Sequence, residues 1–261
     1  MNVTIDRTGY RKIAIVRIAL PSDRAIGTRD AEKLGDAIAS VLNDDSINAI
    51  VVTGSEGRFI PHADVHQIGR AAAALATGRI APDSFLDSPF VRLGRLLDEA
   101  CKPVIAAIDG ECLGAGLEIA IACTMRVAGA GVKQIGLPEI RIGLFPGGGG
   151  TQRMERLVGW QRARTFMLHG RIVDAQEAVA IGLVDEVAQD PMARALEIAA
   201  EIAARSPAAV AALLELTRPR HAPVGFDAEV LAFARLLRDR PETASGLERF
   251  LASGARLRDV V

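Results

Sequence analysis

Two glutamates stand out because each lies in an otherwise apolar stretch of the chain. Glu118 is the one polar residue between Leu117 and Cys123, and Glu139 is the one acid in the stretch 134–142, QIGLPEIRI. Burying an unpaired carboxylate is costly, so acids in such places need a reason. Paired carboxylates in apolar surroundings are the usual way to hold a general acid and a general base with shifted pKa values. The two glutamates therefore predict proton-transfer chemistry.

Backbone amide donors are predicted beside Glu118. The small residues Gly114, Ala115 and Gly116 precede it at the expected start of a helix. The first N–H groups of a helix have no intrahelical acceptor and carry a partial positive charge, and small residues let a ligand approach them. A second candidate donor lies at the loop–helix junction near Ala63. This combination predicts stabilisation of a developing negative charge next to a buried acid.

Each glutamate also has a structural interpretation. Glu118 lies close to the N3 position, where a glutamate can cap its own helix. Glu139 can form an ion pair with Arg141 or with an arginine that is distant in the sequence. Because both acids occur in similar apolar surroundings, we favour a functional role for the pair.

Other residues suggest chemistry less strongly. His62 and His66 have the i, i+4 spacing of two metal ligands on one helix face, but no third ligand is evident in the sequence. We interpret them as pocket or surface residues. The glycine run at 147–150 lacks the Lys-Ser/Thr ending of a nucleotide P-loop and is predicted to be a tight turn before a helix. The sequence contains no G-x-S-x-G elbow and no cysteine with a histidine nearby, so nothing in it supports nucleophilic catalysis.

The segments that carry the glutamates are predicted to alternate between strand and helix. Residues 103–108 are predicted to form a buried strand, because they are rich in β-branched side chains and close with the turn dipeptide Asp109-Gly110. The stretch that contains Glu118 is predicted to be a buried helix, since it is apolar on every side. After Glu139, four glycines precede a helix that begins near Thr151.

Periodicity and turn residues predict the remaining elements. The chain is expected to open with a hairpin of strands at 3–5 and 13–20, with Gly9 in its turn. A helix capped by Thr28 and a buried strand at 47–53 are expected next. Before residue 103 we then expect a short helix from about 63, a surface excursion at 70–82 and a helix at 84–101. After residue 124 we expect short strands at 125–128 and 184–187 and helices from 151, 160 and 174. Asp174 and Glu177 form a capping-box pattern for the last of these helices. Four tail helices are expected to follow, and each begins at or next to a proline. The chain is thus predicted to be α/β for about 190 residues, followed by a helical tail.

Composition narrows the class of protein. A chain of 261 residues with 49% hydrophobic and 24% charged residues is ordinary for a soluble globular protein, with one large domain or a domain and a small appendage. The net charge of −1 gives no electrostatic case for binding nucleic acid or a membrane surface. The longest apolar runs are too short to span a bilayer, and the N-terminal residues are not those of a signal peptide. Cys101, Cys112 and Cys123 are odd in number and fit no metal knuckle, so we expect reduced thiols in a cytoplasmic protein.

Three segments resemble the enoyl-CoA hydratase/isomerase (crotonase) superfamily, and most closely its enoyl-CoA hydratases. IDGECLGAGLEIAIAC resembles the family signature, GLPEIRIGLFPGGGGTQRM resembles its second catalytic segment, and FIPHADV resembles its F-x-x-G-A-D-L loop. The order of these segments, the chain length and the helical tail also agree, so the resemblance covers nearly the whole chain. It implies an α/β fold, a crotonase-like spiral of repeated ββα units with a C-terminal helical trimerisation region.

The resemblance implies a role for each candidate catalytic residue. Glu118 matches the glutamate that activates water, and Glu139 matches the glutamate that exchanges a proton at the substrate α-carbon. Because isomerases of the family usually keep only the second acid, the presence of both favours hydration. The backbone N–H groups of Ala63 and Ala115 would form the oxyanion hole for the thioester carbonyl.

The resemblance also implies an acyl-CoA thioester as substrate, with coenzyme A as part of that substrate and neither a separate cofactor nor a metal. The expected substrate-binding residues are Arg24, Ala25, Ile26, His62, Asp64, Val65, Gly114 and Gly147. Arg24 is a candidate phosphate contact, although a solvated arginine is its default interpretation, and Gly147 matches a glycine whose backbone lies near the catalytic water.

Besides Ala115, which stands where the family pattern usually has a glycine, two further residues depart from that pattern. His62 replaces a glycine next to the predicted donor Ala63, so a positive φ at this position would strain the histidine by about 1 kcal/mol or more. If φ is not positive, His62 can point into the acyl site. Thr124 stands where the signature usually has an acid, and we expect that change to affect structure more than catalysis.

From the residues and the resemblance we expect an enoyl-CoA hydratase. Another crotonase-type reaction on an acyl-CoA (isomerisation, thioester hydrolysis, decarboxylation or retro-aldol cleavage) and a non-catalytic acyl-CoA-binding protein stay open as alternatives. Residues 1–190 are expected to form the catalytic core and residues 191–261 a helical oligomerisation region. The expected assembly is a homotrimer or a homohexamer built as a dimer of trimers.

Overall fold

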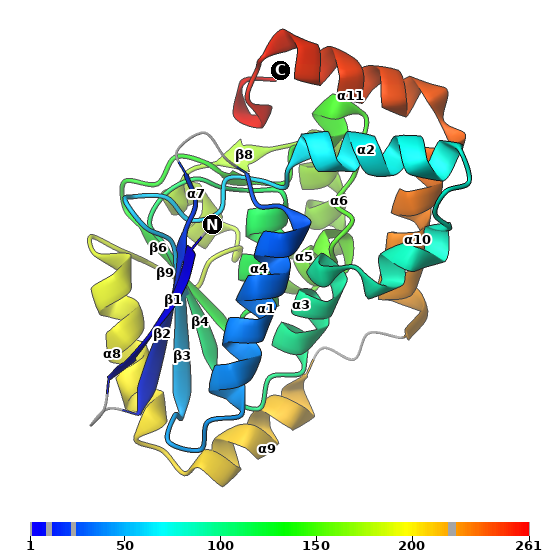
Figure 1. Cartoon of the computed structure of the whole chain (residues 1–261). Helices are drawn as coiled ribbons and strands as arrows, with labels where there is room; N and C mark the ends of the chain where they lie inside the picture. Colours follow the sequence, from blue (N-terminus) through cyan, green and yellow to red (C-terminus); the bar gives the residue numbers. More distant parts are fainter. Residues whose placement is uncertain (1, 9–11, 22–24, 219–222, 261) are drawn as a thin grey trace.

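The computed structural model describes residues 2–8, 12–21, 25–218 and 223–260 (Figure 1). A six-stranded sheet in the order β1-β2-β3-β4-β6-β9 forms its centre. The strands are β1 (Asn2–Thr8), β2 (Ile13–Ala19), β3 (Ala49–Thr53), β4 (Val104–Ile108), β6 (Met125–Gly129) and β9 (Glu186–Ala188). The pair β1/β2 is antiparallel and the other four pairs are parallel. A smaller sheet in the order β5-β7-β8 contains β5 (Cys112–Leu113), β7 (Ile135–Gly136) and β8 (Ile172–Val173).

Helices connect and cover these strands. The α-helices are α1 (Thr28–Leu42), α2 (Val65–Ala76), α3 (Pro89–Asp98), α4 (Ala115–Ala122), α5 (Gly150–Val158), α6 (Trp160–Leu168), α7 (Ala175–Ala180), α8 (Pro191–Ala203), α9 (Pro207–Thr217), α10 (Pro223–Asp239) and α11 (Pro241–Ser253). Short 3-10 helices are η2 (Pro82–Asp87), η3 (Glu139–Ile142) and η4 (Leu257–Asp259). The expected α/β core followed by helices is confirmed.

The central sheet lies between two helical layers, because its strands are buried on both faces. In β4, Val104, Ala106 and Ile108 pack toward α1, α3 and α4, whereas Ile105 and Ala107 pack against α8. Figure 1 shows α8 on one side of the strands and α1, α3 and α4 on the other. A strand covered on both faces is a continuous apolar run without alternation, which is why residues 103–108 could be assigned from sequence.

The helix expected at 84–101 is in fact two elements. Residues 82–87 form η2, and α3 starts afresh at Pro89, which has no N–H to donate to a preceding turn. The Ser88 side chain accepts a hydrogen bond from the Val91 amide (3.3 Å) and so caps α3. The result is a bend between η2 and α3, at the wall of the cavity described below.

Two further expectations upstream were wrong. Residues 70–76 belong to α2 and are not a surface excursion, because Ala72 and Leu75 are buried in an apolar cluster with the C-terminal helices. The N-cap of α1 is Gly27 rather than Thr28, and the Asp30 carboxylate accepts the Gly27 amide (3.0 Å). The hairpin of β1 and β2 is confirmed, but Gly9 lies outside the described residues.

The C-terminal helices pack on the rest of the chain in three different ways. Helix α8 covers the sheet, while α10 and α11 lie against α2 on the far side of α4 (Figure 1). Helix α9 has no fully buried residue, and its Leu213 and Leu216 are 61% and 72% exposed. Helices α8 and α10 therefore complete the fold of their own chain, and the division at residue 190 stays a prediction.

Candidate active site

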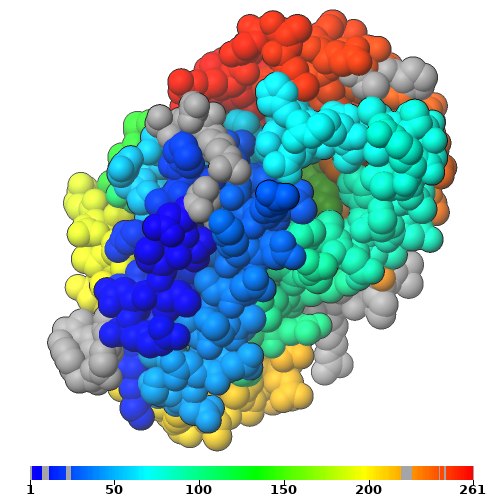
Figure 2. Space-filling model, viewed as in Figure 1, coloured from blue at the N-terminus to red at the C-terminus, as the bar shows by residue number. Residues whose placement is uncertain are grey.

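A cavity of about 410 Å³ lies between α2, η2, α4, η3, the loop before α5 and helix α10. Figure 2 shows this face hollowed between the cyan and teal segments, with green residues at the bottom of the hollow. Most of its lining is apolar, with a few polar groups, which is the usual character of a small-molecule site. The lining residues include Ile26, His62, Ala63, Asp64, Val65, Phe85, Gly114, Ala115, Glu118, Glu139, Ile142, Leu144, Phe145, Gly147, Gly148, Val230, Phe233 and Leu257.

Glu118 reaches the cavity from the start of helix α4. Its amide donates to the Gly114 carbonyl (2.9 Å), so it already lies inside the helix and does not cap it. The carboxylate instead accepts hydrogen bonds from the amides of Gly148 (2.7 Å) and Gly150 (2.9 Å), in the glycine-rich loop before α5. Glu118 is 8% exposed. The self-capping interpretation is therefore wrong, and Glu118 is a buried acid with two fixed donors.

Glu139 is the first residue of η3 and has a different environment. Its Oε2 atom is buried and has no hydrogen-bond partner. Arg141 does not pair with it, because the Arg141 guanidinium donates to the Val260 carbonyl (2.6 Å). A carboxyl oxygen without a partner in an apolar cavity is best accommodated as the neutral acid.

The two acids therefore have unequal protonation tendencies. Burial raises the pKa of Glu139 well above its ordinary value, and the nearby charges of Glu118 and Glu229 raise it further. Burial also raises the pKa of Glu118, but the two amides of the glycine loop and the Arg153 guanidinium oppose that rise. Environments that separate two carboxyl pKa values assign one group as acid and the other as base. The pKa values of both acids are raised, and that of Glu139 is raised well above its ordinary value without amide donors to oppose the rise, so Glu139 is the stronger candidate for the acid and Glu118 for the base.

Ala63 and Ala115, the residues of the two predicted amide donors, both line the cavity. Ala115 is the first residue of α4, so its N–H has no acceptor within the helix. Ala63 forms a parallel bridge with Ile26, in which the Ile26 amide donates to the His62 carbonyl and the Asp64 amide donates to the Ile26 carbonyl, each at 2.9 Å. Because successive amides of an extended chain point to opposite sides, the Ala63 N–H points away from Ile26.

Gly114 separates the donor Ala115 from the acid Glu139. Its φ of 51° lies in a region that favours glycine, and a Cβ atom there would lie 3.0 Å from Glu139 Oε1. The residue therefore has to be small and conformationally free for the helix start and the acid to approach each other.

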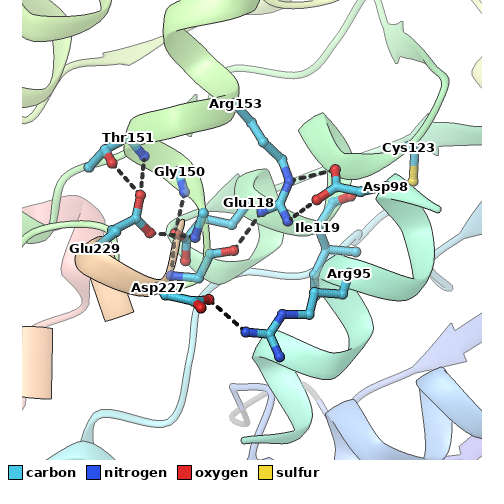
Figure 3. A network of polar contacts seen from close by, with 12 residues as sticks. Arg95, Asp98, Glu118, Ile119, Cys123, Gly150, Thr151, Arg153, Asp227 and Glu229 are labelled. Carbon is cyan, nitrogen blue, oxygen red and sulfur yellow. Dashed lines mark hydrogen bonds and ion pairs between the residues drawn. The ribbon is translucent and has the colours of Figure 1, made fainter. Parts of the chain in front are cut away.

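A third buried acid, Glu229 on α10, was missed from the sequence. Its carboxylate accepts the amides of Gly149 (2.5 Å) and Thr151 (3.1 Å) and also contacts the Thr151 hydroxyl (Figure 3). Burial and the negative charge of Glu118 raise the pKa of Glu229 to about 7. The sequence pattern that identified Glu118, an acid on an apolar helix face, is also present at Glu229, which lies between Phe226 and Phe233 in the sequence.

Arg153 and Asp98 support the same loop from the opposite side. They form a buried two-point ion pair, with Nε–Oδ1 at 3.0 Å and Nη2–Oδ2 at 2.7 Å. The remaining Nη1 of Arg153 donates to the Gly148 carbonyl (2.6 Å), and its guanidinium stacks 4.8 Å from the centre of the Phe226 ring. Arg153 lies within the segment recognised from sequence, but its partner Asp98 is 55 residues away.

The structure brings together most of the predicted substrate-binding residues. Ile26, His62, Asp64, Val65, Gly114 and Gly147 line the cavity. Ala25 is described but is not part of the lining, and Arg24 lies outside the described residues. The carboxylate of Asp64 caps α2 by accepting the Gln67 amide (3.1 Å). Gly147 packs against Phe233, and the neighbouring Gly148 is the residue whose amide faces Glu118.

The two departures from the family pattern have structural explanations. Among described residues other than glycine, only Lys12 and Glu56 have positive φ, so His62 carries no such strain. Its ring lines the cavity, with Nδ1 2.7 Å from the Ala63 carbonyl. The Thr124 hydroxyl accepts the Val104 amide (3.1 Å) and holds β4 beside the end of α4, which makes it a structural residue.

Comparison with known proteins gives a consistent result. Residues 8–251 match the family model described as enoyl-CoA hydratase/isomerase. Over 193 residues, or 72% of this chain, the sequence is 37% identical to the fatty acid oxidation complex subunit alpha of Idiomarina loihiensis, of which it covers 26%. The chain spans about a quarter of the length of the curated relatives it matches.

Solved structures share the fold over nearly the whole chain. A putative enoyl-CoA hydratase from Streptomyces avermitilis superposes with a TM-score of 0.83 at 23% identity, covering 99% of this chain and 95% of that one. Carnitinyl-CoA hydratase from Mycobacterium avium superposes with a TM-score of 0.79 at 25% identity, covering 97% and 96%. The expected crotonase-like α/β fold is confirmed.

Proposed function

Because this chain belongs to the enoyl-CoA hydratase/isomerase family, we propose that it adds water across the double bond of a trans-2-enoyl-CoA thioester. The observation that carries the proposal is the unequal hydrogen bonding of two acids that line one apolar cavity. Glu118 has two amide donors, whereas Glu139 has a buried oxygen without a partner. Hydration needs both a base for the water and an acid for the α-carbon, and these two environments supply one of each.

In the proposed reaction, Glu118 takes a proton from water as the water oxygen bonds to the β-carbon of the substrate. The electron pair of the double bond moves toward the thioester, and Glu139 gives its proton to the α-carbon. The net change is one hydroxyl and one hydrogen added to the double bond, and proton transfer between the acids restores the starting state. Positioned acid–base groups of this kind contribute roughly a hundred- to ten-thousand-fold in rate.

Negative charge develops on the thioester oxygen during this step. The N–H groups of Ala63 and Ala115 are proposed to stabilise it, since both residues line the cavity and belong to backbone held by other hydrogen bonds. Fixed donors of this type contribute about 3 kcal/mol each, because they need no reorganisation as charge appears.

The acyl-chain site, the coenzyme A contacts, the cofactor requirement and the cellular location are also proposals. We infer that the acyl chain lies among Phe85, Phe145 and Phe233, with coenzyme A as part of the substrate and no separate cofactor. Ala25, which is not part of the cavity lining, is proposed to contact the coenzyme A portion of the substrate, and Arg24 stays a candidate phosphate contact. A cytoplasmic location is also proposed. All three cysteines are free, as expected from the sequence, and among the described residues no helix is long and apolar enough to cross a membrane.

The test is hydration of crotonyl-CoA, followed as loss of the enoyl absorbance. The wild-type chain is expected to turn over, and Glu118→Gln and Glu139→Gln are each expected to lose about 100-fold or more in kcat. A matched series of short, medium and aromatic enoyl-CoAs covers the unknown chain length. Absence of turnover on every member would reject the hydratase assignment, and binding without turnover would favour a non-catalytic acyl-CoA-binding protein.

A further inference from the structure

Four successive backbone amides before and at the start of α5 are divided between two buried carboxylates. The first and third, at 148 and 150, donate to Glu118. The second and fourth, at 149 and 151, donate to Glu229. Figure 3 shows the two side chains approaching this segment from different helices, Glu118 from α4 and Glu229 from α10. One short loop therefore connects the active-site acid to the C-terminal part of the chain.

The alternation makes the two sets of hydrogen bonds interdependent. Gly149 has a φ of 102°, which turns its peptide so that neighbouring amides face opposite sides. Rotation of the backbone that frees the amides held by Glu229 would also move the amides held by Glu118. The Arg153 guanidinium holds the Gly148 carbonyl on a third side, so the loop is restrained from three elements.

Glu229 has no role in the proposed reaction. It is 5% exposed and does not line the cavity, although its neighbours Val230 and Phe233 do. Docking of α10 does not explain it either, because Phe226, Val230 and Phe233 already bury the helix face. A buried acid that neither touches substrate nor is needed for packing requires another reason for its presence.

We propose that Glu229 is a positioning residue, which acts through residues 149–151 to keep the Gly148 and Gly150 amides directed at the Glu118 carboxylate. The proposal rests on the proposed function, since the position of Glu118 matters for the rate only if Glu118 acts on the substrate. It also gives α10 a part in catalysis, because the helix brings Glu229 to the loop while contributing Phe233 to the cavity wall.

Glu229 also influences the acid Glu139 through its charge. The charged groups that face this region are Glu118 on α4, Glu139 on η3 and Arg153 on α5. When ionised, Glu229 raises the pKa of Glu139 and so helps to keep the proton on the general acid. Removal of this charge should move the loss of activity at high pH, which reports Glu139, to a lower pH.

The experiment compares Glu229→Ala and Glu229→Gln with a control on the same helix, Asp227→Asn. Asp227 pairs with Arg95 (2.7 Å) and does not contact the loop. For crotonyl-CoA hydration, Glu229→Ala is expected to lower kcat about 100-fold with little change in KM. Glu229→Gln, which keeps one acceptor oxygen, is expected to lose about 10-fold, with its alkaline limb shifted to lower pH. Asp227→Asn should have the kcat and the alkaline limb of the wild type.

Hydrogen exchange gives a readout that does not depend on activity. Measured by mass spectrometry on peptides that cover 145–154, exchange should be faster in Glu229→Ala and unchanged in Asp227→Asn. If the wild type hydrates no enoyl-CoA, the proposed function fails, and the exchange result still decides whether Glu229 holds the loop. Exchange and kcat within twofold of wild type in Glu229→Ala would overturn the positioning role.

A second variant keeps the proposal testable if Glu229→Ala does not fold. Thr151→Val removes the hydroxyl that contacts Glu229 but keeps the amide. We expect a several-fold loss of kcat in Thr151→Val and a smaller additional loss when it is combined with Glu229→Gln, because both changes act on one contact. Fully additive losses would contradict the proposal.

Discussion

At the scale of single residues, the difference between Glu118 and Glu139 comes first from backbone donors, and the Arg153 guanidinium adds to it by lowering the pKa of Glu118. Glu118 accepts two amides from the glycine loop, and Glu139 has a buried oxygen that accepts none. Hydrogen bonds to the charged form lower a carboxyl pKa, and burial without them raises it. Two glutamates of the same intrinsic acidity thus differ, because of their surroundings, in how readily they bind a proton, which is the difference that the proposed base and acid roles require.

Gly114 provides a test of how closely these groups are packed. Replacement by alanine places a Cβ atom 3.0 Å from Glu139 Oε1 at a φ of 51°. We expect Gly114→Ala to lower the free energy of unfolding by about 1–3 kcal/mol and kcat by about 10-fold or more.

Gly35→Ala in α1 is the matched control, because a Cβ at Gly35 meets nothing within 4 Å and the position is ordinary helix. It should stabilise the protein by about 0.5–1 kcal/mol without changing kcat. Denaturant unfolding and steady-state kinetics measure both effects. An active, stable Gly114→Ala protein would show that the helix start and the acid are not in close contact.

The residue-level predictions from the sequence succeeded where an acid interrupted an apolar segment. Glu118 and Glu139 were found in this way, and the structure places both in one cavity. Glu229 carried the same signal, but residues 191–261 were predicted to form an oligomerisation region and no site residue was assigned to them. The split of the amides at 148–151 between two acids depends on tertiary contacts between α4, α5 and α10, so no local pattern in the sequence contains it.

At the scale of elements, the loop before α5 is the part on which the site depends. Glu118 on α4, Arg153 on α5 and Glu229 on α10 each bond the loop directly (Figure 3). Asp98 on α3 acts through Arg153, with which it pairs. The helix start also supplies a partial positive charge that favours the two carboxylates. A short loop with four glycines is flexible by itself, and these contacts give it one conformation.

Loss of one partner in the buried Asp98–Arg153 pair should therefore affect both stability and catalysis. Asp98→Asn leaves the Arg153 charge buried, at 2% side-chain exposure, without its carboxylate. We expect a loss of about 3–5 kcal/mol in the free energy of unfolding. The half-exposed pair Arg95–Asp227 is the control, and Asp227→Asn should cost less than about 1 kcal/mol. Equal effects in the two variants, measured by denaturant unfolding, would contradict the support assigned to Arg153.

Element boundaries were predicted well where turn residues were recognised and poorly elsewhere. The prolines at the starts of α8, α9 and α11 and the cap at Asp174 were correctly interpreted. The Glu177 half of the predicted capping box was wrong, because the Glu177 carboxylate pairs with Arg171. The helix at 84–101 was extended through Ser88-Pro89, although this dipeptide carries both a cap and a start signal. Helix α2 was ended too early, because its alanine-rich turns are buried in an apolar cluster to which α10 and α11, more than 140 residues later in the chain, contribute.

At the scale of the whole molecule, three acids whose pKa values are raised by burial make stability depend on pH. A carboxyl whose pKa is higher in the folded state binds more protons when folded, so its stabilising contribution is present below the unfolded pKa and is lost as pH rises through the folded pKa. For Glu229, the window lies between the ordinary value of 4.5 and about 7. Glu118 and Glu139 act in the same direction.

We therefore expect the free energy of unfolding to fall as pH rises from about 5 to 8. Glu229→Gln should flatten this dependence by an amount on the order of 3 kcal/mol across the window. Denaturant titrations at several pH values measure the effect, with Asp227→Asn as the variant that keeps the wild-type slope. A wild-type stability that increases over this range would show that these acids are not buried as described.

The exposed leucines of α9 are the best candidates for contact between subunits. Leu213 and Leu216 are more than half exposed in the single chain. Neighbouring apolar side chains that are exposed to water are typical of a surface that another protein covers. We expect light scattering to give a trimer or a hexamer, and Leu213→Asp with Leu216→Asp to shift it toward smaller species. A monomeric wild type would contradict the proposed assembly. Folding of the variant monomer, checked by circular dichroism, separates a lost interface from unfolding.

The pH dependence of kcat for crotonyl-CoA hydration tests the assignment of general acid and base most directly. The wild type should show a bell-shaped profile, which rises as Glu118 ionises and falls as Glu139 loses its proton. Glu139→Gln should retain about 1% or less of the wild-type kcat at every pH. A fully active Glu139→Gln enzyme, or a wild-type kcat that shows no alkaline decrease, would contradict the two-glutamate mechanism.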